Sequence, residues 1–338
     1  MTDLRELWER SGVTRVWPGK KGTLAFEWVD DQGRLRAGSA SASGVTILDH
    51  GTDPALPGLS PDRPGTIVVH RYGRRAVAVT RDTVTKYTRA GQAAPVVHGS
   101  RRFAELCSRA GIATPEVLSH DDARIEFAKA PGASLHDLGD AGVEGWRRFV
   151  EAWPAMAGGE ADLPTHSADD EAATLARWHG LALEHGAIPR NAALDRAVEE
   201  VCADLSGHDD GPIGVIHRDL HDKQLLWDGE RLTLLDLDLG SRGEIAQDLG
   251  NALAHAEVRG RQGVLSVEGV TRMVDLLAGA VPALEVNPAR VVLHRRAARL
   301  RIGFVHAFRP ADQSWLLPWL EECAARTHHH DTLERTLS

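Results

Sequence analysis

Short apolar runs separated by turn residues dominate the first third of the chain, and longer segments with helical spacing dominate the rest. Three runs rich in apolar and β-branched residues lie close together: Thr66–His70, Ala76–Thr80 and Thr83–Tyr87. Runs of this length with polar turns between them predict a meander of antiparallel strands. The region from Trp17 to Thr80 has no long helical period, so we expect the first part of the chain to be mostly β.

Helical spacing starts near Ser100, where Phe103, Leu106 and Cys107 form an apolar stripe that predicts a helix to about Ala110. After Leu135 the pattern becomes mainly helical, with predicted helices at Val143–Ala157, Asp169–His185, Ala192–Leu205, Val267–Ala278, Pro288–Phe308 and Ser314–Ala325. This change of pattern predicts an α+β fold with a small, mostly antiparallel β lobe at 1–130 and a larger, mainly helical lobe at 131–338. Prolines and glycines between Asp49 and Gly65 predict a loop that separates a β extension, 1–65, from a second β unit, 66–130.

The segment with the most chemical information is Val215–Leu239, which reads V-I-H-R-D-L-H-D-K-Q-L-L-W-D-G-E-R-L-T-L-L-D-L-D-L. Asp219 follows one short apolar run, and Asp236 ends another. Phosphoryl transfer needs two carboxylates with different duties: one accepts the proton of the acceptor hydroxyl, and the other holds magnesium against the nucleotide phosphates. The spacing therefore indicates a kinase-like site.

This segment resembles the catalytic core of the aminoglycoside phosphotransferase and choline kinase family, the small-molecule branch of the protein-kinase-like fold. The family's pattern is His-x-Asp-x-x-x-x-Asn with a later strand-borne Asp. The resemblance implies that Asp219 is the catalytic base, that Asp236 is the principal metal ligand, and that His221 stands where protein kinases carry Lys. Gln224 replaces the usual Asn, and we expect its amide oxygen to be a further metal ligand. Similar glutamines in maltokinase-like sugar kinases point toward a sugar acceptor.

The same resemblance implies roles for residues outside the motif. Lys86 lies in the third strand-like run, where the fold carries the lysine that contacts the α and β phosphates, and Glu105 on the next helix is expected to form an ion pair with it. Asp248 lies in a segment that matches the family's Gly-Asp-Pro-x-x-Asp-Leu pattern in part. We expect Asp248 to hold the catalytic loop through hydrogen bonds without touching substrate.

Two further segments are candidates for nucleotide binding. The turn Arg71–Arg75 contains Gly73, which permits close backbone approach, and Arg74, which is expected to contact phosphates. The strand that leads into Pro131 and Gly132 resembles the family's hinge. That resemblance implies adenine binding by the backbone near Glu126 and Ala128. The implied cofactors are ATP or GTP and Mg²⁺.

Charge and cysteine content limit the partners and the compartment. The formal net charge of −9 argues against nucleic acid or an anionic membrane as the main partner. Three widely spaced cysteines, Cys107, Cys202 and Cys323, predict reduced thiols. The start of the chain is amphipathic and charged, and no long apolar run occurs. We therefore expect a cytoplasmic protein, a monomer or a homodimer, whose partner is a small molecule with a hydroxyl group.

Three alternatives remain open at this stage. His217, Asp219 and His221 alternate and, with Asp222, would suit a metal-dependent hydrolase. A kinase-like binding protein is the second alternative, with Gln224 as a sign of weakened catalysis. The third is a buried β-hairpin with polar turns. Aminoglycosides, other antibiotics, choline-like amines, sugars and amino sugars all remain possible acceptors. A protein acceptor is disfavoured because no Ala-Pro-Glu motif follows Asp236.

Overall fold

The computed structural model describes residues 4–10, 12–207 and 211–325. The chain begins with a short helix, α1 (Leu4–Trp8), and a four-stranded antiparallel sheet. This N-terminal sheet has the order β1-β2-β3-β4, with strands at Val13–Pro18, Leu24–Val29, Leu35–Ser41 and Gly44–Ile47. Residues 48–65 follow without helix or strand, as the prolines and glycines predicted.

The second sheet has five strands and contains the predicted meander. Its order is β5-β6-β7-β9-β8, with strands at Thr66–Arg71, Arg75–Val79, Thr83–Thr88, Val117–His120 (β8) and Arg124–Ala128 (β9). Alternation along β7 buries Thr85 and Tyr87 and leaves Lys86 on the opposite face. Helix α2 (Ala93–Arg109) joins β7 to β8 and begins earlier than the predicted start near Ser100.

The second lobe is mainly helical, as predicted. Its helices are α3 (Leu135–Leu138), α4 (Val143–Ala157), α5 (Ala168–Glu184), α6 (Ala192–Gly207), α7 (Ile245–Arg261), α8 (Val267–Ala278), α9 (Pro288–His306) and α10 (Gln313–Ala324), with 3-10 turns η1 (Gly139–Gly142), η2 (Asp222–Gln224), η3 (Leu237–Leu239) and η4 (Pro310–Asp312). Two small sheets hold the central motif: β10 (Ala133–Ser134) with β12 (Leu225–Trp227) and β13 (Leu232–Leu234), and β11 (Ile213–Ile216) with β14 (Ser241–Glu244).

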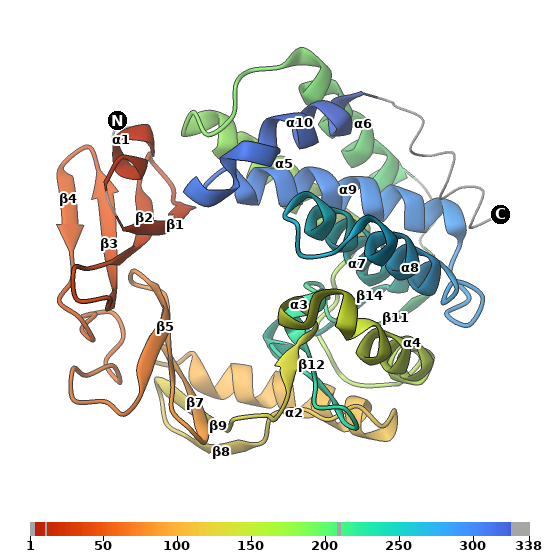
Figure 1. The fold of residues 1–338 in the computed structure, drawn as a ribbon, viewed down its shortest axis with the longest axis horizontal. Coiled ribbons are helices and arrows are strands. Elements are labelled where there is room, and N and C mark those ends of the chain that lie inside the picture. The colour runs from red at the N-terminus through yellow and green to blue at the C-terminus, as the bar shows by residue number, and fades with distance from the viewer. Residues whose placement is uncertain (1–3, 11, 208–210, 326–338) are drawn as a thin grey trace.

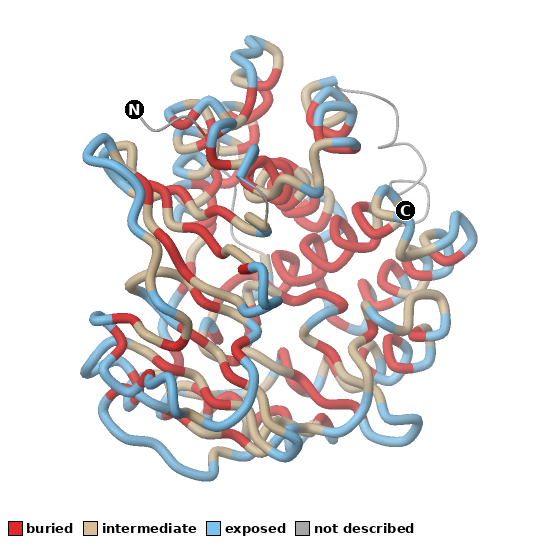
Figure 2. The backbone as a smooth tube through the Cα atoms, turned by 60° about the vertical axis from the view of Figure 1, so that its left-hand side comes forward, coloured by how far each residue is buried: buried red, intermediate tan, exposed pale blue. Residues whose placement is uncertain are grey.

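Helices α7 and α9 form the centre of the helical lobe, because most of their residues are buried. Figure 2 shows long buried helical stretches inside the molecule. Helix α5 begins with a capping box, in which the side chains of Ser167 and Asp170 each accept the other residue's backbone N–H. None of the described helices has the length and apolar character needed to cross a membrane.

The N-terminal sheet contacts both lobes. Val16 and Phe26 belong to the hydrophobic core that α5, α6, α9 and α10 build in the helical lobe, and the amide of Val16 donates to the carbonyl of Phe308 at 3.1 Å. On the other side, β2 and β3 contact β5, and buried Glu27 accepts the amide of His70 at 2.7 Å. Figure 1 shows this sheet between β5 and the helices α5 and α10. The extension is therefore packed into the molecule.

Candidate active site

The loop that follows β11 is held by one buried carboxylate, as predicted. Asp248 on α7 is 0% exposed, and its two oxygens accept the amides of His217 at 2.5 Å and Arg218 at 2.8 Å. Arg218 has a φ of 70°, a conformation that costs a non-glycine residue energy unless its surroundings hold it. Asn251, one turn along α7, donates to the carbonyl of Leu220 at 2.9 Å. Helix α7 thus fixes the position of the loop that carries Asp219.

The ring of His217 links this loop to the strand that precedes Asp236. Its Nε2 donates to the carbonyl of Leu235 at 2.8 Å, and its Nδ1 accepts the amide of Asp219 at 3.3 Å. Both ring nitrogens are occupied by the backbone. The predicted role of His217 as a metal ligand in a hydrolase is therefore wrong.

Asp219 lies beside two stacked imidazoles. Nε2 of His221 is 3.7 Å from a carboxylate oxygen of Asp219, and the rings of His221 and His255 stack with centroids 4.4 Å apart. Burial alone would raise the pKa of Asp219, but the contact with His221 lowers it to about 2. Burial would lower the pKa of His221, but the carboxylates of Asp219 and Asp222 raise it. Asp219 is therefore ionised at neutral pH. The raised pKa of its neighbour His221 favours the positively charged form of that imidazole.

Asp222 belongs to a structural network. Arg259 on α7 donates to both of its oxygens, at 2.6 and 2.8 Å, and Nδ1 of His136 lies 2.9 Å from one of them. Burial would raise the pKa of Asp222, but the contacts from His136, His221 and Arg259 hold it well below its usual range. Because its oxygens are already engaged, Asp222 is not the further metal ligand that the hydrolase alternative predicted.

Lys86 joins two aspartates of the central motif. Its Nζ donates to Asp236 at 2.7 Å and to Asp238 at 2.8 Å. Asp236 has a φ of 55°, which turns the chain so that the two carboxylates converge on one cation. Burial would raise the pKa of Asp236, but Lys86 lowers it. Asp238 was not singled out from the sequence, although the D-L-D pattern contained the signal.

The predicted ion pair between Lys86 and Glu105 is wrong, because Lys86 is paired with the two aspartates and Glu105 is exposed. Phe103 faces the core from α2, and Glu105 follows two residues later, about 200° around the helix. Its side chain therefore points to solvent.

Gln224 lies close to this acidic pair through its backbone. Its carbonyl accepts the amide of Leu235 at 2.8 Å, next to Asp236, and its side-chain amide has no hydrogen-bond partner in the described part of the chain. Two carboxylates that already converge on one cation are hard oxygen donors that suit Mg²⁺. Asp236 and Asp238 therefore fit the predicted metal, and coordination by the Gln224 amide stays a prediction.

A buried carboxylate from the loop before β5 anchors the basic turn between β5 and β6. Gly73, with a φ of 60°, donates its amide to the carboxylate of Asp53 at 2.7 Å, so this amide does not face a phosphate. Arg74 is exposed at the tip of the turn. The positive charge of Arg75 helps to lower the pKa of Asp236, after Lys86. The sequence named Arg71, Arg74 and Arg75 as sources of positive charge for the phosphates, and a phosphate contact by Arg74 stays a prediction.

The predicted hinge residues lie within strand β9. Glu126 is paired with both β7 and β8, and its side chain accepts a hydrogen bond from Ser119 at 3.0 Å. The amide of Ala128 donates to the carbonyl of Glu116 at 2.9 Å, so it is not free for adenine. Beyond the strand, the amide of Ala130 has no backbone partner among the residues that the structure describes. The backbone site for adenine therefore fits the segment just after β9 better than the strand.

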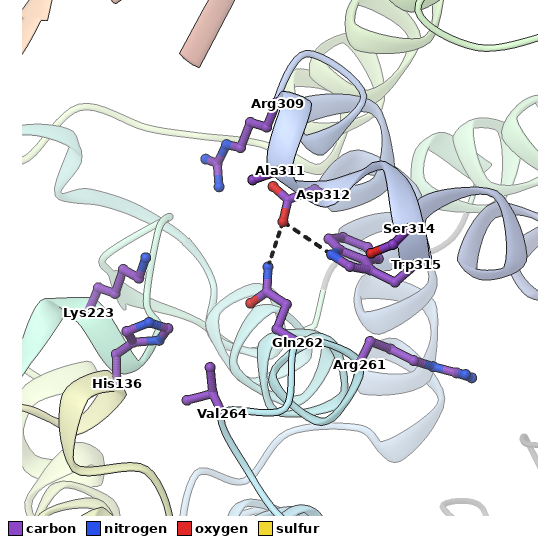
Figure 3. A pocket seen from close by; sticks show the side chains of 10 residues that line it. All are labelled: His136, Lys223, Arg261, Gln262, Val264, Arg309, Ala311, Asp312, Ser314 and Trp315. Atoms are coloured by element: carbon purple, nitrogen blue, oxygen red, sulfur yellow. Dashed lines mark hydrogen bonds between the residues drawn. The ribbon is translucent and has the colours of Figure 1, made fainter. Parts of the chain in front are cut away.

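A polar cavity of about 380 Å³ lies beside the catalytic loop (Figure 3). It is lined by His136, Lys223, Arg261, Gln262, Val264, Arg309, Ala311, Asp312, Ser314 and Trp315. The carboxylate of Asp312 is held there by Gln262 at 3.2 Å and by the indole of Trp315 at 3.1 Å. His136 connects the cavity to Asp222 and so to the loop of Asp219.

The sequence profile of the phosphotransferase enzyme family matches residues 68–268, which is more than half of the chain and includes both aspartates of the motif. The chain belongs to the phosphotransferase enzyme family. It is a small-molecule phosphotransferase, as the motif predicted. A search of curated proteins found no match to it.

The folds of solved structures that superpose on this chain are consistent with this family. A choline/ethanolamine kinase family protein from Mesorhizobium loti superposes with a TM-score of 0.55 at 16% identity, over 82% of this chain and 94% of that one. An amicoumacin kinase in complex with AMP-PNP, Ca²⁺ and Ami gives 0.51 at 12% identity, over 97% and 94%. Aminoglycoside phosphotransferase APH(4)-Ia, in a ternary complex with AMP-PNP and hygromycin B, gives 0.50 at 15%, over 98% and 97%. The predicted protein-kinase-like fold is confirmed.

In this phosphotransferase, the residues that the sequence did not reveal come mainly from α7. Arg259 and His255 reach the catalytic loop from the second half of that helix. Their spacing in the sequence is typical of the polar face of an ordinary helix. Only the tertiary contact between α7 and η2 brings them to Asp222 and His221. No local signal could have identified them.

Proposed function

We propose that this phosphotransferase moves the γ-phosphate of ATP to a hydroxyl group of a small molecule, with Asp219 as the base. The observation that carries the proposal is the double anchoring of the catalytic loop. Asp248 ties the loop to α7, and His217 ties it to the strand of Asp236. Phosphoryl transfer depends mainly on positioning, so a fixed relation between base and metal ligands is the feature that matters.

The nucleotide half of the site consists of Lys86, Asp236, Asp238 and Gln224. We assign Lys86 to the nucleotide phosphates and the two carboxylates, with the Gln224 amide, to magnesium. Magnesium at that position would neutralise charge on the β and γ phosphates. Lys86 forms ion pairs with both carboxylates, at 2.7 and 2.8 Å. With nucleotide bound, phosphate oxygens would bind Lys86 and the metal ion would bind the two carboxylates. These contacts would replace the ion pairs between Lys86 and the carboxylates.

The acceptor half consists of Asp219, His221 and the polar cavity. A pKa of about 2 keeps Asp219 ionised, so its oxygen accepts a hydrogen bond from the acceptor hydroxyl and orients that oxygen toward the phosphorus. His221 has a raised pKa, which favours a positive charge beside the transferred phosphoryl group. A cavity of about 380 Å³ suits a sugar-sized acceptor or part of a larger antibiotic.

The test is ADP release in the presence of a panel of alcohols that covers sugars, amino sugars, aminoglycosides and other antibiotics. The proposal expects at least one acceptor to increase ADP release, with phosphate found on its hydroxyl by mass spectrometry. A protein that binds Mg²⁺-ATP but phosphorylates no member of the panel would favour the binding-protein alternative. Absence of Mg²⁺-ATP binding would refute the proposal.

A metal-dependent hydrolase is the second candidate, supported by one observation. Ligand atoms of Asp219, His221 and His255 lie within 4.8 Å of one another. This set differs from the one that the sequence suggested, since His255 joins Asp219 and His221 whereas His217 and Asp222 do not. Elemental analysis of the protein as purified distinguishes the two functions. The kinase proposal expects no stoichiometric zinc or manganese, whereas one equivalent of either, with hydrolysis that is indifferent to nucleotide, would favour the hydrolase.

A further inference from the structure

Two cationic side chains from distant parts of the chain line the acceptor cavity, and a third, Arg15, lies outside its lining but acts on one of them. Arg15 comes from β1, Lys223 from η2 in the catalytic loop, and Arg309 from the segment after α9. Lys223 and Arg309 line the cavity, and Figure 3 shows their charged ends pointing into the same open space. Arg15 and Arg309 each adjoin the hydrogen bond that joins Val16 to Phe308. Because Val16 is buried, strand alternation turns Arg15 to the opposite face of β1.

The positive charge of this cluster is poorly compensated within the described residues. Lys223 and Arg309 form no ion pair there. The guanidinium of Arg309 lies 3.1 Å from Nε2 of His306, and burial lowers the pKa of His306 to about 4, so that ring is neutral at pH 7. Arg15 forms a longer ion pair, at 3.9 Å, with the buried carboxylate of Glu27. Elsewhere in the same lobe, buried arginines have close carboxylate partners, as Arg259 has in Asp222.

Arg15 and Arg309 also act on one another. Burial and the charge of Arg15 lower the pKa of Arg309 to about 10. A protein with a net charge of −9 thus concentrates repelling positive charges at the wall of its acceptor cavity.

The two carboxylates closest to these cations are already engaged. Asp222 is bound by Arg259 and His136. Asp312 accepts hydrogen bonds from Gln262, Trp315 and His306. Neither is free to neutralise Lys223. An anionic group of a ligand would supply the partner that Lys223 and Arg309 lack, because charge-assisted hydrogen bonds are stronger than neutral ones.

We propose that Lys223 and Arg309, with Arg15 beside them, form an anion subsite of the acceptor pocket, which selects acceptors that carry a carboxylate or phosphate beside the hydroxyl to be phosphorylated. This inference rests on the proposed function and narrows its substrate class. A polycationic aminoglycoside would be repelled from this wall. The inference also gives the N-terminal sheet a role, because its contact with the segment after α9 brings Arg15 close to the pocket.

The test is a comparison of ligands matched in size and different in charge. Binding of D-glucuronate, D-glucose 6-phosphate, D-glucose and D-glucosamine is measured by calorimetry on the full chain. We expect one of the two anions to bind at least about tenfold more tightly than glucose, and glucosamine to bind no better than glucose. Which anion binds more tightly identifies carboxylate or phosphate as the preferred group. Equal or weaker binding of both anions would overturn the inference.

Variants identify the residues. Lys223→Gln, Arg309→Gln and Arg15→Gln should each weaken binding of the preferred anion about tenfold or more, whereas Lys223→Arg should restore most of it. Arg81→Gln is the matched control, because Arg81 is 94% exposed in the turn between β6 and β7. Unchanged anion binding in all three variants would overturn the inference.

Binding of Mg²⁺-ATP to the same samples separates this inference from the proposed function. Retention of Mg²⁺-ATP binding by the wild type, with the anion preference and its loss in the variants, is the expected result. If the variants weaken binding of Mg²⁺-ATP and leave binding of the anion unchanged, the cations hold the nucleotide. That result would refute the inference and leave the proposed kinase function intact. If the wild type binds no Mg²⁺-ATP, the proposed function itself fails.

Discussion

Replacement of Asp248 by Ala should disable the enzyme without direct contact with substrate. The substitution leaves the buried amides of His217 and Arg218 without acceptors. An unsatisfied buried group costs about 1–3 kcal/mol, so the two together would cost about 2–6 kcal/mol if the loop stays in place. If the loop moves to regain partners, Asp219 moves with it, and a displacement of about 1 Å lowers turnover roughly a hundredfold. Asp248→Asn keeps one acceptor oxygen and should have about half the effect.

Two measurements on the same variants decide this prediction. Urea unfolding gives the free energy of unfolding, and ADP release with saturating acceptor gives kcat. We expect both to fall in the order wild type, Asn, Ala. KM for ATP should change less than kcat, because Lys86, Asp236 and Asp238 lie on other segments and, of the four residues assigned to the nucleotide half, Gln224 alone lies on the loop. Asp62→Ala, at an exposed loop position, is the control. Wild-type stability together with wild-type kcat in Asp248→Ala would refute the anchoring role.

Three further predictions concern metal binding and pH. Asp238→Asn should raise the Mg²⁺ concentration needed for half-maximal activity about tenfold or more, whereas Glu105→Gln should leave it unchanged; a magnesium titration of ADP release checks both. Burial would raise the pKa of Glu244, but His294 and Arg290 lower it to about 2 from 4.5. Its contribution of about 3 kcal/mol is therefore present above pH 4.5 and lost as the pH falls toward 2, and urea unfolding at pH 7, 5 and 3 should show an acid loss that Glu244→Gln lacks. Since the pKa of Asp219 is about 2, kcat should show no acid limb from the base between pH 5 and 8.

Local patterns were sufficient for the elements and for part of the site. The runs that became β5, β6 and β7 alternate over a few residues between turns, and each strand was located to within about one residue. Asp248 could be assigned because its role depends on a motif with a fixed order of strand, loop and helix. Its two hydrogen bonds to the catalytic loop confirm the assignment.

Helix phase and tertiary contacts account for what the sequence did not reveal. Glu105 was chosen for its distance along the chain from Lys86, but the apolar stripe through Phe103 already turned it to solvent. The partners of Lys86 come from residues more than a hundred positions away. Arg15 belongs to the same class, because only the packing of the N-terminal sheet on the helical lobe brings it near Lys223.

The central claim is that Asp219 accepts the proton of the acceptor hydroxyl while a separate group of residues holds Mg²⁺-ATP. The most direct test is Asp219→Asn, assayed for ADP release with acceptor and for Mg²⁺-ATP binding by calorimetry. We expect kcat to fall at least about a thousandfold and the dissociation constant of Mg²⁺-ATP to change less than about threefold. Undiminished turnover by Asp219→Asn would contradict the account.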